Sequence, residues 1–360
     1  MNVQPASCDA KRPLKVSIIW HGLPAYAARL IRSIACREDI ELTLIGSDTP
    51  ARPAYLQEIV GQPIHWVGND PTSPLLTELA QRPMDLCLTT GWAFAPCKRF
   101  AAIAKAGGAK VCSMIDNRWR GDLRQRIGKA YFHLFLRDAF DYAWVPGASA
   151  SKLCAYLGVP QSRIATGLYG SDSSLFAPPT NVADRPYRIG FVGQHIRRKG
   201  LDVLLEAFRR LCASDARYQL HLYGEGELRG MAESTPGVLC HSFSDPEEIA
   251  AAMKTFRIFV MPSRDDNWPL ALHEAALSGC CLLATRDVGN TPELITAENG
   301  IVVCSGDPEA LTQGLHTLAQ WSDEQRIRAA YVSRQLAEPF GPDRWRREFL
   351  GICSQLRCPR

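Results

Sequence analysis

The sequence predicts an α/β protein with two doubly wound, Rossmann-like domains that face each other across a cleft. Short apolar runs typical of buried strands alternate along the 360-residue chain with stretches in which apolar residues recur at helical spacing. A polar, proline-rich segment, PPTNVADRP at residues 178–186, separates two such halves. Because alternating strands and helices form parallel sheets, we expect an N-terminal domain over residues 1–178 and a C-terminal domain over residues 187–338.

The composition is that of an ordinary globular protein with a net charge of +4. No apolar run approaches the roughly 18 residues that span a bilayer, and the first residues, MNVQPASCDAKRPLK, lack the apolar core of a signal peptide. We therefore expect a cytoplasmic protein. The basic residues form no stripe and no nucleic-acid-binding module is recognisable, so nucleic acid is not an expected partner.

The thirteen cysteines show no Cys-x-x-Cys spacing, which disfavours a metal clamp. Several of them fall in or beside apolar runs: Cys87, Cys112, Cys240, Cys281 and Cys304. We expect these to be reduced, buried thiols that pack as small apolar side chains.

Polar residues follow two strand-like runs of the first half. The strand-like runs lie at residues 16–20, 42–46, 64–67, 86–89, 111–115 and 143–146. His21 and Gly22 come directly after the first run, and Asp116 and Asn117 come after the run at 111–115. Ligands bind at the carboxyl edge of such sheets, so these residues are candidates for contact with a substrate. The alternatives are a structural turn histidine and an Asp-Asn pair that simply ends its strand.

A basic cluster follows at residues 118–129, RWRGDLRQRIGK, and begins with Arg118. It suits a phospholipid surface or a lipid-linked diphosphate acceptor. Gly121 and Gly128 are expected to interrupt an amphipathic helix here, and a solvated helix face is the alternative interpretation.

The second half opens with a strand-like run at residues 187–192, followed by the loop GQHIRRKG at 193–200 and a helical pattern. A glycine loop with three consecutive basic residues before a helix offers open backbone N–H groups and positive charge, which suits a diphosphate. The candidate residues of this loop are Gly193, Gln194, Arg198 and Lys199. A second glycine turn, at Gly224, follows the run at 220–223.

The segment 257–285 reads as strand, helix, strand. An apolar run at 258–261 leads into a polar loop, Pro269 begins a helical pattern that stops at Gly279, and a second run follows at 281–284. Asp266 lies before the helix N-terminus and Glu274 lies within the helix. A ligand with phosphates between two hydroxyl-bearing ends would suit this arrangement. The alternative is an exposed N-cap region followed by a solvated Glu.

The stretch 262–295, PSRDDNWPLALHEAALSGCCLLATRDVGNTPELI, resembles the signature of the retaining nucleotide-sugar glycosyltransferases of family 4, the group 1 transferases with GT-B architecture. The matching residues are Pro262, Ser263, Glu274, Ala275, Gly279, Gly289 and Glu293. Asp266 stands where that family has a glutamate. The resemblance is specific over about residues 187–310 and loose before residue 143.

The resemblance implies roles on the donor side. Glu274 would bind the ribose hydroxyls, Asp266 would lie beside the transferred sugar, and Lys199 would bind the diphosphate. Gln194 replaces an arginine of the family, so Arg198 or its neighbour Arg197 would supply the missing charge. The remaining donor-binding candidates are Gly193, Gly224, Asn267, Trp268, Pro269 and Leu270.

On the acceptor side, the resemblance places Asp116 near the donor sugar and His21 at the loop that faces the acceptor. We therefore expect the catalytic residues to be Asp266, Glu274, Asp116 and His21. Gly22, Asn117 and Arg118 would contact the acceptor or its anionic group. The last segment, residues 339–360, would cross back onto the first domain.

The expected function is transfer of a sugar, with retention, from a nucleotide diphosphate sugar to a glycan or lipid-linked saccharide of cell-surface polysaccharide synthesis. No cofactor or metal is expected, although Asp265 and Asp266 form an acidic pair. Peripheral contact with the inner face of the cell membrane is expected from the basic cluster. The alternatives are a non-catalytic nucleotide-sugar-binding subunit and another GT-B enzyme, such as an epimerase or a phosphorylase.

Overall fold

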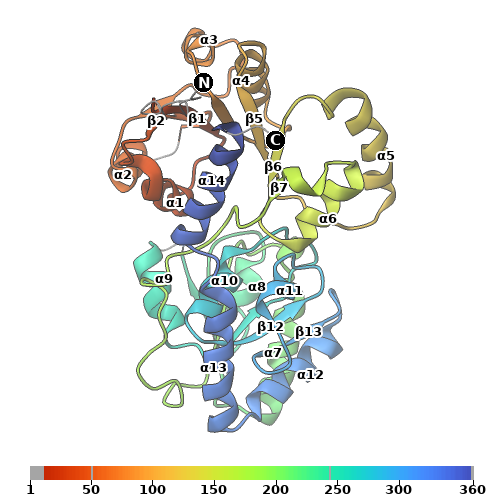
Figure 1. Cartoon of the computed structure of the whole chain (residues 1–360). Coiled ribbons are helices and arrows are strands. Elements are labelled where there is room, and N and C mark those ends of the chain that lie inside the picture. Colours follow the sequence, from red (N-terminus) through yellow and green to blue (C-terminus); the bar gives the residue numbers. More distant parts are fainter. Residues whose placement is uncertain (1–11, 50–51, 243–244, 358–360) are drawn as a thin grey trace, which may run out of the picture.

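The computed structural model describes residues 12–49, 52–242 and 245–357, which form two parallel sheets (Figure 1). The first sheet has the order β3-β2-β1-β4-β5-β6-β7. Its strands are β1 (Leu14–Trp20), β2 (Ile40–Gly46), β3 (Ile64–Trp66), β4 (Leu86–Thr90), β5 (Lys110–Met114), β6 (Tyr142–Trp144) and β7 (Ile164–Ala165). The second sheet has the order β10-β9-β8-β11-β12-β13. Its strands are β8 (Arg188–Val192), β9 (Gln219–Tyr223), β10 (Val238–His241), β11 (Ile258–Met261), β12 (Cys281–Thr285) and β13 (Gly300–Val303).

Helices cover both sheets. Those of the first domain are α1 (Ala25–Ala35), α2 (Pro53–Val60), α3 (Pro74–Gln81), α4 (Ala95–Ala106), α5 (Leu123–Tyr131) and α6 (Ala148–Leu157). Those that follow are α7 (Leu201–Ser214), α8 (Arg229–Glu233), α9 (Pro246–Met253), α10 (Leu270–Leu277), α11 (Thr291–Leu294), α12 (Pro308–Ala319), α13 (Asp323–Ala337) and α14 (Pro342–Arg357). Short 3₁₀ turns lie at Gln161–Arg163 and Arg197–Lys199, and a π-helical turn, η1, lies at Phe132–Leu136.

The central strands are apolar on both faces because helices cover both sides of each sheet. All residues of β11 and β12 are buried, as are all but one residue of β1. In each sheet the strand order reverses beside the first strand, between β1 and β4 and between β8 and β11. The carboxyl ends at these reversals form the crevice in which such folds bind ligands. The prediction of two doubly wound domains is confirmed.

Helix α14 belongs spatially to the first domain, although it follows the second in sequence (Figure 1). The Trp345 ring packs on the Trp144 ring with 4.8 Å between centroids, and Phe349 is fully buried in the same core. The chain therefore crosses between the domains twice.

The structure corrects the prediction for the basic cluster. Gly128 lies inside α5, which begins with the Asp122 side chain accepting a hydrogen bond from the Gln125 N–H and runs directly into η1. A glycine inside a helix costs only about 1 kcal/mol relative to alanine, so one does not break the helix. Five apolar side chains along α5 and η1 are exposed: Leu123, Ile127, Tyr131, Leu134 and Phe135.

Two further expectations have clear outcomes. Cys87, Cys112 and Cys281 are buried as predicted, whereas Cys304 is exposed, because it follows the edge strand β13.

In the part of the chain that the structure describes, no helix is both long and apolar enough to cross a membrane.

Candidate active site

A cavity of about 380 Å³ lies where the carboxyl edges of the two sheets face each other. The first domain contributes Tyr26, Asp116, Arg120 and Tyr169 to its lining, and the second contributes Arg198, Lys199, Asp265, Asp266, Asn267, Trp268, Pro269 and Leu270. Residues that sequence reasoning placed at separate strand ends and loops therefore converge on one cavity between the domains.

Asp266 is buried and held from several directions. Its N–H donates to the Asp287 carbonyl at 3.1 Å, and its own carbonyl accepts from the Gly289 N–H at 2.9 Å. Lys199 Nζ donates to Asp266 Oδ2 at 2.5 Å, and Ser263 Oγ donates to the same oxygen at 3.4 Å. The phosphate-binding candidate and the sugar-side candidate are therefore an ion pair in the free protein.

Asp116 faces this pair from the first domain. Burial raises the pKa of its carboxyl, and the negative charge of Asp266 raises it further, while hydrogen bonding to Tyr169 acts in the opposite direction. The Tyr169 ring meets the Tyr26 ring edge-on, with 5.6 Å between centroids. Asp116 therefore holds its proton more tightly than an exposed aspartate does, opposite a carboxylate that is ion-paired with Lys199.

Glu274 lies behind the cavity, at the seam between the domains. It lines a small void of about 40 Å³ together with Tyr26, which also lines the larger cavity. The Ser171 hydroxyl, from the first domain, donates to Glu274 Oε1 at 3.0 Å. Burial raises the pKa of Glu274 to about 7, although the Ser171 hydrogen bond lowers it. The carboxylate can accept further hydrogen bonds from ligand hydroxyls, because Ser171 occupies only one of its acceptor positions.

Ion pairs close the cleft beside the cavity. Arg118 donates to Asp265 at 3.0 Å and to Asp287 at 2.9 Å, and Arg120 donates to both Asp265 oxygens at 2.9 and 2.8 Å. The arginines belong to the first domain and the aspartates to the second. The Arg118 side chain is only 11% exposed, so it is held in this contact between the domains.

The glycine-rich loop is packed tightly against its neighbour. A side chain at Gly224 would place its Cβ 2.1 Å from the Gly193 carbonyl oxygen, so these turns require the close approach that glycine allows. Arg198 lines the cavity and donates to the Asp265 carbonyl at 2.8 Å, whereas Arg197 lies 3.5 Å from Asp202. Gln194 is exposed and does not line the cavity.

His21 and Gly22 stand at the carboxyl end of β1 but do not line the cavity. The His21 Nδ1 lies 3.1 Å from Ser47 Oγ, and its ring stacks on Phe94 at 3.8 Å. Asn117 lines a neighbouring hollow. The structure thus brings Asp116, Lys199 and Asp266 together and leaves His21 outside.

Trp268 and Glu293 join the two domains. A Cβ on Gly147 of the first domain would lie 2.3 Å from the Trp268 ring, and Glu293 accepts from the Ala148 N–H at 2.7 Å. Among the described residues, no group of three or more His, Cys, Asp or Glu side chains is placed to hold a metal ion. Asp265 is instead neutralised by arginines.

Residues 186–320 match the family Glycosyl transferases group 1. This segment therefore resembles a group 1 glycosyltransferase domain. The matched segment contains the Lys199–Asp266 pair, Glu274 and the whole second sheet. Among curated relatives, the lipopolysaccharide core biosynthesis mannosyltransferase LpcC of Rhizobium leguminosarum bv. viciae is 27% identical over 187 residues, 47% of this chain and 52% of that protein. The chain spans about half the length of the curated relatives it matches.

Solved structures resemble the whole fold and not only the segment that matches this family. A glycosyltransferase from Rickettsia africae has a TM-score of 0.77 at 13% identity, covering 97% of this chain and 100% of that one. The Anabaena protein Alr3699/HepE, in complex with UDP and glucose, has a TM-score of 0.74 at 14% identity, covering 95% and 100%. At such identities the likeness shows the fold alone, and the GT-B prediction is confirmed.

Sequence reasoning missed Tyr26, Tyr169, Arg120 and Ser171 as residues of the site. Tyr169 and Ser171 follow the short strand β7, so a polar turn after a strand was the available signal. Tyr26 lies in the first turn of α1, does not follow a strand directly, and had no comparable signal.

Proposed function

We propose that this protein is a retaining glycosyltransferase of family 4 type, which transfers a sugar from a nucleotide diphosphate sugar to a saccharide acceptor. The observation that carries the proposal is the Lys199–Asp266 ion pair, set in a cavity between the domains and opposite Asp116. Such a site offers a cation for phosphate and carboxylates for a sugar on which positive charge develops. The matched group 1 domain and the UDP complex of a protein with the same fold support the choice of donor.

In this proposal the diphosphate takes Lys199 from Asp266 and lies against the first turn of α10, where partly positive N–H groups are open. The cavity has two further cations, Arg198 and Arg120. They supply the positive charge toward the diphosphate that Gln194 cannot supply. The ribose hydroxyls donate hydrogen bonds to the Glu274 carboxylate. Asp266 and Asp116 then flank the transferred sugar. None of these roles requires a metal ion or a cofactor.

The acceptor is proposed to be a glycan or lipid-linked saccharide of cell-surface polysaccharide synthesis, reached at the inner face of the cell membrane. The mannosyltransferase LpcC, named for lipopolysaccharide core biosynthesis, supports this class. The exposed cations Arg124 and Arg126 on α5 support contact with an anionic surface.

A donor screen followed by turnover tests the proposal. Nucleotide sugars and their nucleoside diphosphates are first compared for their effect on the thermal unfolding temperature, because a ligand that binds only the folded state raises it. The stabilising donor is then incubated with saccharide acceptors, and the anomeric configuration of the product is read by NMR. An inverted product would contradict retention. An epimerised donor formed without acceptor would favour the epimerase, and binding without turnover would favour a non-catalytic subunit.

Lys199→Ala is expected to weaken binding of UDP, the first probe, much more than binding of uridine. The lost contact is a charged hydrogen bond to phosphate, worth about 1.5–3 kcal/mol, or roughly tenfold to a hundredfold in Kd. Isothermal titration with both ligands measures the difference. Arg197→Ala is the matched control, since Arg197 lies in the same loop but does not line the cavity. Equal losses for UDP and uridine would assign Lys199 a structural role.

Binding to lipid vesicles is expected to require anionic lipid and to weaken as salt rises. Arg124 and Arg126 provide the attraction, which salt screens. Sedimentation with vesicles of phosphatidylglycerol or phosphatidylcholine, at low and high salt, measures it. Strong binding to phosphatidylcholine at high salt would show that charge does not drive the contact.

A further inference from the structure

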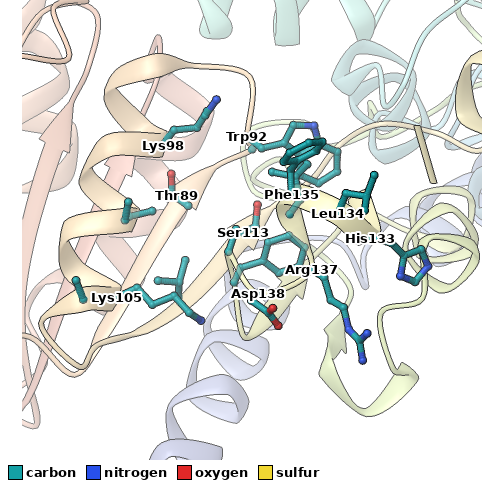
Figure 2. Close-up of a pocket in the computed structure, with 18 residues that line it drawn as sticks. Thr89, Trp92, Lys98, Lys105, Ser113, His133, Leu134, Phe135, Arg137 and Asp138 are labelled. Carbon is teal, nitrogen blue, oxygen red and sulfur yellow. The ribbon is translucent and has the colours of Figure 1, made fainter. Parts of the chain in front are cut away.

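A second, larger cavity of about 550 Å³ lies in the first domain, away from the proposed donor site. It opens between α4 and the segment that contains η1, with the ends of β4 and β5 at its floor (Figure 2). Its apolar lining includes Trp92, Phe140 and three alanines of α4. Its volume falls in the range of small-molecule sites, and nothing in the proposed transfer reaction uses it.

The mouth of this cavity is apolar and exposed. Leu134 and Phe135 of η1 line it and are 75% and 66% exposed. Leu123, Ile127 and Tyr131 continue the same face of the helix at intervals of four residues, and each is more than half exposed. An apolar strip of this length is unusual on a surface that faces only water. It leads along α5 and η1 directly to the opening of the cavity.

Cations surround the strip and the mouth. Lys98 and Arg137 are exposed at the rim, and Arg124 and Arg126 flank the strip on α5 (Figure 2 shows the two rim residues). None of these four side chains forms an ion pair with another residue in the described part of the chain. The neighbouring cation Lys105 is paired with Asp141 at 2.9 Å, and the exposed carboxylate at the rim is Asp138.

An intermediate hollow of about 340 Å³ lies between this cavity and the proposed active site and shares wall residues with each of them. Trp92 and Leu136 line both the apolar cavity and this hollow, while Arg120 and Asp265 line both the hollow and the cleft cavity. Polar residues of the hollow include Asn117 and Arg124. The lining thus changes from apolar at one end to charged at the other.

We propose that the apolar cavity holds the hydrocarbon chain of a lipid-linked acceptor, whose phosphate lies among the cations of the rim and hollow and whose saccharide reaches the cleft. The inference rests on the proposed glycosyltransferase function and specifies its acceptor. A hydrocarbon chain that leaves a membrane along the exposed apolar strip reaches the cavity without crossing water. A second copy of this chain fits the face less well, because two such faces would oppose like charges.

The test measures binding of 11-bromoundecyl phosphate to the full chain, below the concentration at which the probe forms micelles. Bromine quenches the fluorescence of nearby tryptophan, and comparison with Trp92→Phe isolates the signal of the cavity. Undecanol and inorganic phosphate separate the contributions of chain and charge. We expect saturable quenching that Trp92→Phe largely removes, and weaker or no binding of the two partial probes.

Ala102→Phe fills the cavity from an exposed position on α4, and we expect it to raise the Kd of the probe at least tenfold. Ala95→Phe is the matched control, because Ala95 is exposed on the same helix but does not line the cavity. Replacing both Lys98 and Arg137 by alanine should reduce the preference for the alkyl phosphate over the alcohol. An unchanged Kd of the probe in Ala102→Phe would overturn the inference. It would also be overturned if Ala102→Phe lost vesicle binding but still bound the probe with the parental Kd.

UDP binding is measured in the same proteins, so that the two proposals can fail separately. Probe binding that depends on Ala102, without binding of any nucleoside diphosphate from the donor screen, would retain the chain site and reject the glycosyltransferase. If UDP binds and Ala102→Phe does not change the Kd of the probe, the chain site is rejected and the glycosyltransferase is retained. With a lipid-linked acceptor, Ala102→Phe should raise KM at least tenfold and leave kcat within about twofold. A water-soluble acceptor should be unaffected.

Discussion

Glu274→Gln should make the free protein more stable at pH 8 while weakening its binding of UDP. Burial raises the pKa of Glu274 to about 7, from 4.5 in an exposed glutamate. Below pH 4.5 the carboxyl is protonated in both the folded and the unfolded states, so its titration does not change the free energy of unfolding. Between the two values the folded state keeps a proton that the unfolded state has lost, and stability therefore falls as the pH rises. Above pH 7 the full penalty, on the order of 3 kcal/mol, is present.

Glutamine removes this penalty because it has no charge to bury, and it keeps an oxygen that accepts the Ser171 hydrogen bond. The same change removes a charged acceptor of the ribose hydroxyls, which should weaken UDP binding by about 1.5–3 kcal/mol. Urea unfolding at pH 5 and pH 8 measures the first effect, and calorimetric titration at pH 8 measures the second.

Glu293→Gln is the matched control. Burial also raises the pKa of Glu293, and its carboxylate joins the two domains through the Ala148 N–H. The Glu293→Gln substitution should therefore reduce the loss of stability at high pH. It should not change the affinity for UDP, since Glu293 lies outside the cleft cavity. If Glu274→Gln binds UDP as tightly as the parent, Glu274 is not the ribose ligand.

Asp266→Asn should lower kcat by roughly ten- to a thousandfold, on the scale of losing one group that stabilises the transition state. Positive charge develops on the sugar only during transfer, so the loss should appear in turnover and not in ground-state binding. The change also frees Lys199 from its 2.5 Å ion pair. UDP should consequently bind no more weakly than it does to the parent.

Steady-state kinetics with the donor and acceptor found by the screen, together with UDP titration, separate these effects. Asp265→Asn is the control, because this adjacent carboxylate is already paired with Arg118 and Arg120 and should alter KM more than kcat. Asp266→Glu, which has the residue usual in family 4, should retain measurable activity. A parental kcat in Asp266→Asn would mean that the carboxylate only shapes the loop.

The fold was predictable because its signal is local. The buried strands are continuous apolar runs, and the loop-to-helix turn at Pro269 carries its own proline and glycine markers. Helix α2 has a weaker local signal, because it is only eight residues long and begins at Pro53. The site was predictable only in part, since each strand end could be placed on an edge but not matched with its partner on the other domain. Arg118 and Asp265 are 147 positions apart, and no spacing in the sequence relates them.

The exposed strip on α5 shows a different limit. Its apolar residues have the spacing that normally predicts burial, and only the three-dimensional structure shows that the described part of the chain does not cover them. The cations in the same segment had suggested contact by charge alone. Because Arg118 and Arg120 are bound to Asp265, the proposed contact with a membrane surface rests on the apolar side chains as well as on the remaining cations.

The position of Trp345 and Phe349 affects how the chain folds during synthesis. The seven-stranded sheet leaves the ribosome early, but part of its core is supplied by α14, after the whole second domain. At a translation rate of about 5–20 residues per second, α14 is synthesised roughly ten to forty seconds after the rest of the first domain. During this interval the surface of α1 that α14 later covers is open to chaperones and to other nascent chains. Slow translation of the second domain should therefore lower the yield of folded protein, although every residue of the first sheet has already been made.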